Sequence, residues 1–162
     1  MGKRSLVIPA VFLQAAVVLV GCGALAFLLW EPHIEGRNAH ATASAIYFKD
    51  PFLAYAYLAS LPFFVGLYQA FKVVGCIGKD KAFTPETVRA LRTIRICALT
   101  LIGFVAVGEL FIVLGKSDDR TGGFFMGFLI VSFSAVTAAG AALFERRVRR
   151  VVEMGSRNPL AD

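Results

Sequence analysis

The chain has almost no charge in four long stretches, and this absence is its most informative feature. The 162 residues include 17 Lys and Arg and 11 Asp and Glu, yet the four stretches contain one formal charge between them, Glu109. The stretches are Leu6–Trp30, Pro51–Phe71, Ile96–Leu114 and Thr121–Phe144. Together with a mean hydropathy of +0.70, this segregation excludes a water-soluble domain and indicates an integral membrane protein.

Cysteine and histidine are also scarce. Cys22, Cys76 and Cys97 form no Cys-x-x-Cys pair, which argues against a disulfide framework. We interpret the three cysteines as small apolar side chains that fill space between helices. His33 and His40 lie seven residues apart without a third ligand at a fitting spacing, so we predict no metal site and no cofactor. No nucleophile–base pair or carboxylate pair is recognisable, and we therefore expect a protein that is not an enzyme.

One alternative at the N-terminus stays open. Lys3-Arg4, an apolar run and Leu19-Val20-Gly21-Cys22 together look like a lipoprotein signal with a lipidated Cys22. The apolar run, however, continues past Cys22 to Trp30 without a polar residue. We therefore favour a membrane-spanning first segment.

The apolar stretches are 19 to 25 residues long, and a hydrocarbon core needs about 20 helical residues. Helices are expected because backbone N–H and C=O groups inside lipid must pair within their own segment. We predict one all-α membrane domain over residues 1–162. It is a four-helix bundle whose spans lie at about 6–30, 51–74, 96–114 and 121–144.

The last two helices are expected to extend beyond the membrane. Thr84 is the predicted N-cap and Pro85 the first residue of a helix that continues to Leu114, so that residues 85–95 project from the bilayer. The fourth helix should project over residues 145–154. The predicted contact between these overhangs is apolar. Its residues are Val88, Leu91 and Ile94 in the third helix and Phe144, Val148, Val151 and Val152 in the fourth.

Basic residues collect before the first span, between the second and third, and after the fourth, where 13 of the 17 Lys and Arg lie. By the positive-inside rule, both termini and the middle loop should be cytoplasmic. The overhangs then carry an arginine-rich face, which we interpret as binding anionic lipid headgroups. Docking of an acidic cytoplasmic protein is the alternative, and nucleic acid is disfavoured because the face lacks interleaved aromatics. The arginines are Arg89, Arg92, Arg95, Arg146, Arg147, Arg149 and Arg150.

Glu109 is the main candidate for a functional residue inside the membrane. An ionisable group within a span is costly and suggests a functional site, here for a proton or a cation. Alternatively, Glu109 extends toward the outer surface or hydrogen-bonds with Tyr55, Tyr57, Lys116 or Arg120.

A strip of small residues follows the fourth span at helical spacing. Small residues let membrane helices approach closely. Two interpretations are open: an interface for a second copy or a partner, or packing inside the bundle. The strip contains Gly123, Gly127, Ser134, Ala138 and Ala142.

The segment Phe83-Thr84-Pro85-Glu86-Thr87-Val88-Arg89-Ala90-Leu91-Arg92 resembles the bacterial membrane family catalogued as domain of unknown function 2975. The similarity in layout covers roughly residues 45–150 and is sharp over residues 83–92, where Thr87 stands in place of the usual Asn. The resemblance implies a four-helix protein of the bacterial inner membrane. It brings no known activity and no functional residues.

The leading hypothesis is therefore a non-enzymatic regulatory or accessory subunit, either a homo-oligomer or part of a larger membrane complex. It would act through helix packing and its arginine-rich cytoplasmic face. The alternative is a small proton- or cation-coupled transporter that uses Glu109.

Overall fold

The computed structural model is all-α and describes residues 3–34, 51–114 and 120–157. Its four helices are α1 (Lys3–Ile34), α3 (Pro51–Gly78), α4 (Pro85–Leu114) and α5 (Arg120–Arg157). No strand occurs among these described residues. Each helix contains a segment that is long and apolar enough to cross a membrane. The predicted all-α fold with four spans is confirmed.

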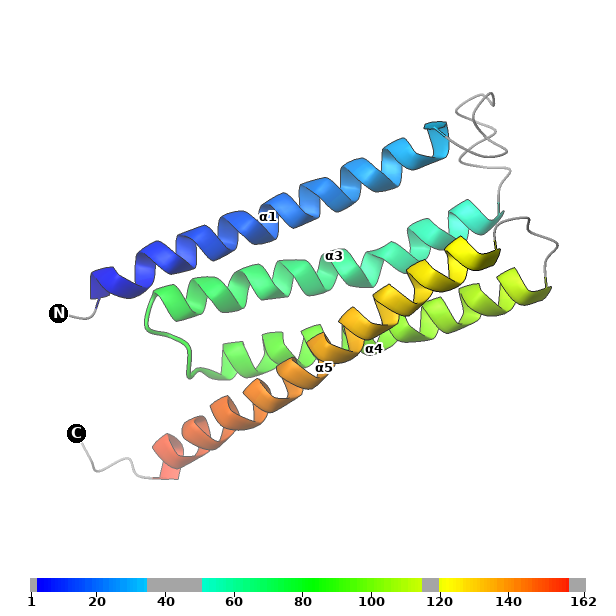
Figure 1. Ribbon diagram of the computed structural model, residues 1–162. Helices are drawn as coiled ribbons and strands as arrows, with labels where there is room; N and C mark the ends of the chain where they lie inside the picture. Colours follow the sequence, from blue (N-terminus) through cyan, green and yellow to red (C-terminus); the bar gives the residue numbers. More distant parts are fainter. Residues whose placement is uncertain (1–2, 35–50, 115–119, 158–162) are drawn as a thin grey trace.

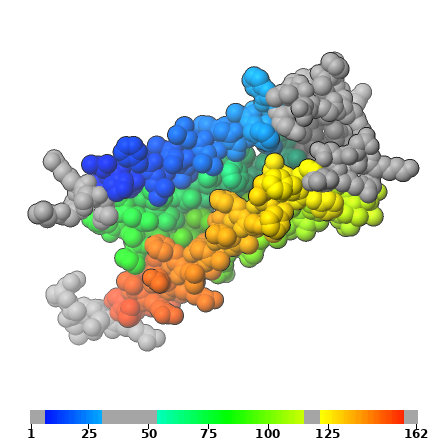
Figure 2. Space-filling view, viewed as in Figure 1, coloured from blue at the N-terminus to red at the C-terminus, as the bar shows by residue number. Residues whose placement is uncertain are grey.

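The helices pack in the order in which they follow one another in the chain. α1 lies against α3, α3 against α4, and α4 against α5, and neighbouring helices run antiparallel (Figure 1). The start of α1 and the end of α5 therefore lie at the same end of the molecule. Within the described residues, no comparable contact joins α1 to α5, so the four helices form an open array. Figure 2 shows α1 along one edge and α5 crossing the front.

Small side chains allow the close contact between α1 and α3. A Cβ atom added at Gly78 would lie 2.7 Å from the Cβ atom of Ala10, and Ala10 is buried. One turn along α1, the Gln14 side-chain amide donates a hydrogen bond to the Phe71 carbonyl oxygen at 3.2 Å. The two helices are therefore held together by close packing at a glycine and by a hydrogen bond from a polar side chain to the backbone of the neighbouring helix.

α3 ends in a Schellman motif. The N–H of Lys81 donates to the carbonyl of Cys76 at 2.8 Å, and the N–H of Asp80 donates to the carbonyl of Ile77 at 3.2 Å. Asp80 has a φ of 56°, the left-handed conformation that this motif requires. The two hydrogen bonds satisfy helix-end carbonyls that would otherwise lack a partner.

α4 begins with the predicted cap. The Thr84 hydroxyl accepts a hydrogen bond from the backbone N–H of Thr87 at 3.4 Å, and Pro85 is the first helical residue. The Thr87 side chain is fully buried, and its hydroxyl donates to the Lys81 carbonyl at 3.3 Å. Thr87 belongs to the segment 83–92 that resembles the family. Its hydrogen bond joins the start of α4 to the loop after α3, which explains why a hydrogen-bonding side chain stands at position 87.

The core lies where α3, α4 and α5 meet, at the end of the array formed by the start of α4 and the end of α5. Val73, Ala90, Leu91 and Val148 form a buried cluster, and the Val148 side chain is completely inaccessible. Further apolar side chains pack against this cluster, namely Ile77, Val88, Ile94 and Val152. The predicted packing of the two overhangs is confirmed for these residues, and α3 joins it through Val73 and Ile77.

The predicted contact face of α5 is wrong at two positions. Phe144 is 40% exposed and Val151 is 41% exposed. The buried side of α5 instead passes through Ala141, Glu145 and Val148. A carboxylate occupies the position expected for an apolar residue because two arginines neutralise it, as the geometry of the site shows.

Candidate functional site

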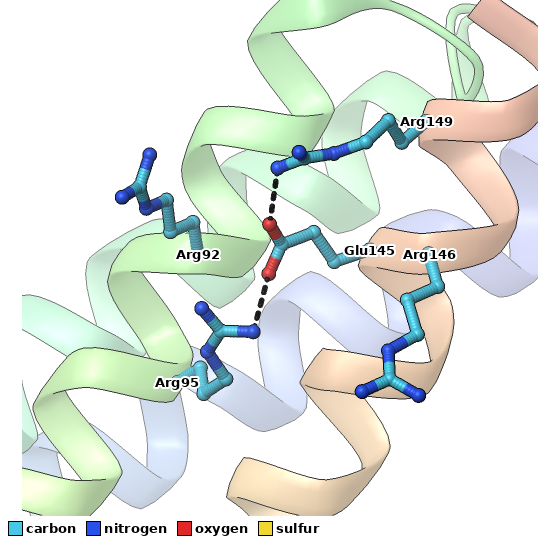
Figure 3. A pocket seen from close by; sticks show the side chains of 5 residues that line it. All are labelled: Arg92, Arg95, Glu145, Arg146 and Arg149. Carbon is cyan, nitrogen blue, oxygen red and sulfur yellow. Dashed lines mark hydrogen bonds and ion pairs between the residues drawn. The ribbon is translucent and has the colours of Figure 1, made fainter.

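All the predicted arginines lie on one end of α4 and α5, which we call the arginine-rich end (residues 85–95 and 145–157). A pocket of about 330 Å³ opens there between the two helices. It is lined by Arg92 and Arg95 of α4 and by Glu145, Arg146 and Arg149 of α5 (Figure 3). The other three arginines are exposed and do not line it; they are Arg89, Arg147 and Arg150.

Glu145 organises this pocket. Its side chain is 5% exposed, and its Oε1 accepts a hydrogen bond from Nη2 of Arg149 at 2.8 Å. Its Oε2 lies 3.1 Å from Nη1 of Arg95. That oxygen accepts no hydrogen bond among the described residues, so the Arg95 contact is an ion pair whose N–H groups are not aligned with the oxygen. The carboxylate therefore connects α5 to α4 by charge.

Two of the pocket arginines have no carboxylate partner among the described residues. Figure 3 shows the Arg92 and Arg146 side chains extending away from Glu145, one from each helix. Arg149 has further N–H donors beyond the one that it gives to Glu145, and the N–H donors of Arg95 form no hydrogen bond with Glu145. The pocket is thus lined by four arginines and one carboxylate, an excess of positive charge that attracts anions.

The sequence prediction missed Glu145, although the chain contains two signals for it. Glu145 and Arg149 have the i, i+4 spacing of a helical ion pair. In addition, Arg95 directly precedes the third apolar stretch and Glu145 directly follows the fourth, so antiparallel spans bring the two residues to the same end of the bundle. Apolar periodicity alone gives no weight to either signal.

The structure also brings together two features that the sequence named separately. Glu109 of α4 lies against Gly127 of α5, where an added Cβ would overlap the Glu109 carboxylate and lie 3.2 Å from Val105. The Oε2 atom of Glu109 is buried and accepts no hydrogen bond among the described residues. Glycine at position 127 therefore provides the space in which the carboxylate lies.

The two tyrosines that were possible partners of Glu109 instead donate hydrogen bonds from their hydroxyl groups to backbone carbonyl oxygens. Tyr55 donates to Phe104 at 2.5 Å, and its ring packs edge-on against the ring of the same residue at a centroid distance of 5.7 Å. Tyr57 donates to Leu28 of α1 at 3.1 Å. These bonds connect α3 to both of its neighbours. The side chains of Lys116 and Arg120, the other predicted partners of Glu109, lie outside the described residues.

The small-residue strip of α5 lies on the side that packs against α4. Gly127, Ser134 and Ala138 are buried, Ala142 is partly buried, and a Cβ added at Gly123 would lie 2.7 Å from Cδ1 of Ile112. This arrangement agrees with the second interpretation of the strip, packing inside the bundle.

Among the described residues, no group of three His, Cys, Asp or Glu side chains gathers in a way that could hold a metal ion. His40 and the side chain of His33 lie outside them. Cys97 is buried, and Cys22 is exposed on α1, which continues through it without a break. Lipidation of Cys22 stays the alternative to the favoured membrane-spanning first segment.

Comparison with known proteins places the chain among relatives of unknown role. The family model described as "Protein of unknown function (DUF2975)" matches residues 36–156. The chain is similar to the "Uncharacterized membrane protein YoaS" of Bacillus subtilis (strain 168), at 34% identity over 152 residues, which cover 93% of this chain and 95% of the relative. No solved structure matches. The predicted resemblance to this family is confirmed, and the four apolar helices are those of a multi-pass membrane protein.

Proposed function

This chain belongs to the DUF2975 family, and we propose that it acts as a non-enzymatic regulatory or accessory subunit in the bacterial inner membrane. In this proposal both termini and the arginine-rich end are cytoplasmic. The concentration of Lys and Arg beside the ends of the spans on that side supports this orientation.

The arginine-rich pocket is the observation that carries the proposal. Arg92 and Arg146 are displayed on two helices that the Glu145 ion pairs hold together, and neither has a carboxylate partner among the described residues. Guanidinium groups displayed in this way recognise anionic groups on a partner or on the membrane. We propose that the chain works by binding, either to a second copy or within a larger membrane complex.

Site-specific photo-crosslinking in cells tests this proposal. A photoreactive residue at position 150 samples the arginine-rich end, and one at position 125 samples an exposed apolar site on the same helix, where Phe125 is 65% exposed. We expect a discrete protein adduct from position 150 and none of the same mass from position 125. A purified protein that stays monomeric and gives no specific adduct at position 150 contradicts the proposal.

Glu109 supports a second candidate, a small transporter coupled to protons or cations. Its carboxylate lies in the α4–α5 contact beside Gly127 with one buried oxygen that accepts no hydrogen bond from the described residues. Unpaired carboxyl groups within a span are costly, and they are found where ions or protons move.

Measuring proton and cation flux into proteoliposomes separates the two candidate functions. A flux that is driven by a pH gradient and disappears in Glu109→Gln, with unchanged protein incorporation, supports transport. Equal flux in the wild type and the variant ends this candidate.

A further inference from the structure

The pocket between α4 and α5 has the chemistry of a phosphate site at the surface of a membrane. We propose that it binds the phosphate of one anionic phospholipid through the arginines that line it, Arg92 and Arg146 among them. The inference names a ligand for the arginine-rich end, and its biological role rests on the function proposed above.

The position of the pocket favours a lipid. Arg95 directly precedes the apolar stretch that begins at Ile96, and Glu145 directly follows the stretch that ends at Phe144. The pocket therefore lies where two spans leave the hydrocarbon, at the level of the lipid headgroups.

The charges of the pocket fit a phosphate group. Arg95 and Arg149 are oriented by Glu145, so their remaining N–H donors are held in place. Arg92 and Arg146 add two guanidinium groups from opposite sides of the pocket (Figure 3). Guanidinium groups bind phosphate oxygens through paired N–H donors, and a phosphate placed here would offset the excess positive charge.

Exposed apolar side chains continue from both Arg92 and Arg146 into the span. Ile96 and Leu99 follow Arg92 at i+4 and i+7, and they are 52% and 55% exposed. On α5, Leu143 precedes Arg146 by three residues and is 62% exposed. Residues at these spacings share a helix face, so acyl chains attached to a bound phosphate would lie along exposed apolar surface. Inorganic phosphate would leave that surface unused.

Lipid titration of the purified full-length protein, followed by native mass spectrometry, tests the site. The probes are phosphatidylglycerol, which is anionic, and phosphatidylcholine, which carries no net charge. The test variant is Arg92→Gln with Arg146→Gln. The matched control is Arg147→Gln with Arg150→Gln, which removes the same charge from exposed arginines outside the pocket.

We expect the wild type to bind one phosphatidylglycerol in preference to phosphatidylcholine. The pocket variant should lower that affinity by about tenfold or more, because Arg92 and Arg146 line the pocket and guanidinium groups bind phosphate through paired N–H donors. The control should change it by less than about threefold, because Arg147 and Arg150 do not line the pocket and contribute only screened attraction. Arg92→Lys keeps the charge but lacks the paired donors. It should give an intermediate loss in a protein whose fold is unperturbed.

Equal losses in the pocket variant and the control would show diffuse attraction and overturn the site. Unchanged binding in both would overturn it as well. Displacement of the lipid by millimolar inorganic phosphate would mean that a soluble anion occupies the pocket, and the lipid assignment would be wrong. Equal binding of the two lipids by the wild type, with the adduct from position 150 intact, would count against this site alone, because the adduct tests the subunit role.

Discussion

At the scale of single residues, the contact between α4 and α5 contains two carboxylates in opposite situations. Glu145 is 4% exposed and is bound by one arginine from each helix. Glu109 lies nearer the other end of the same contact, and its buried oxygen accepts no hydrogen bond within the described part of the chain. A buried charge is tolerated when it is paired and is costly when it is not. Neutralising Glu145 should therefore lower the stability of the protein, and neutralising Glu109 should raise it.

Glu145→Gln should destabilise the protein by about 1–2 kcal/mol. The estimate lies below that for a fully buried pair because the Arg95 and Arg149 side chains are 34% and 51% exposed, and solvent screens their charges. Thermal unfolding in detergent measures the effect, with Glu153→Gln as the control, since Glu153 is exposed on the same helix. An equal effect in the two variants would mean that the Glu145 ion pairs contribute nothing.

Glu109→Met should stabilise the protein by roughly 1–2 kcal/mol, because it replaces a carboxyl whose buried Oε2 accepts no hydrogen bond among the described residues with an apolar side chain of similar length. The control is Leu110→Met at a neighbouring position that is 56% exposed. The same unfolding assay applies. A lower melting temperature for Glu109→Met than for the control would show that the carboxylate has a stabilising partner.

At the scale of elements, the helix ends follow local hydrogen-bond chemistry. The end of α3 places Asp80 in the left-handed region, where a Cβ atom is unfavourable and glycine is preferred. Thr84 and Pro85 begin α4 at the residues predicted from the sequence, because an N-cap and a first-turn proline act within a few residues of each other.

Asp80→Gly should stabilise the α3–α4 connection by roughly 0.5–1 kcal/mol, because glycine adopts the required positive φ without strain. Lys79→Gly, one residue earlier, should give no gain, since Asp80 is the only non-glycine residue with positive φ in the described chain. Thermal unfolding of the two variants measures the difference. A gain from both substitutions, or from neither, would contradict this account of the turn.

The residues that each helix buries against its neighbours were harder to predict than the residues at which the helix begins and ends. For α5, apolar periodicity favoured Phe144 and Val151, yet Glu145 occupies the contact and both apolar residues are exposed. The reason is that Arg95 on another helix neutralises Glu145, and a partner from elsewhere in the chain does not appear in a local pattern. Likewise, the sequence named Glu109 and Gly127 separately, and only the packing of α4 on α5 shows that one accommodates the other.

At the scale of the whole molecule, the four helices form an open array in which α1 has its extended contact with α3 alone among the described elements. Large apolar side chains are exposed along α1, α3, α4 and α5, as expected where lipid surrounds the helices. Alternating helix directions place the arginine-rich end and the start of α1 on one side of the array (Figure 1). The functional proposals depend on which side of the membrane that is.

Cysteine accessibility measures this orientation most directly. In a background without Cys22, Cys76 and Cys97, single cysteines at Lys79 and Ser156 report on the arginine-rich end. A cysteine at Ser117 reports on the turn that the sequence places outside. With a membrane-impermeant maleimide, we expect labelling at position 117 in intact cells and at positions 79 and 156 only after permeabilisation. Labelling of positions 79 and 156 in intact cells, with position 117 protected, would contradict the cytoplasmic placement.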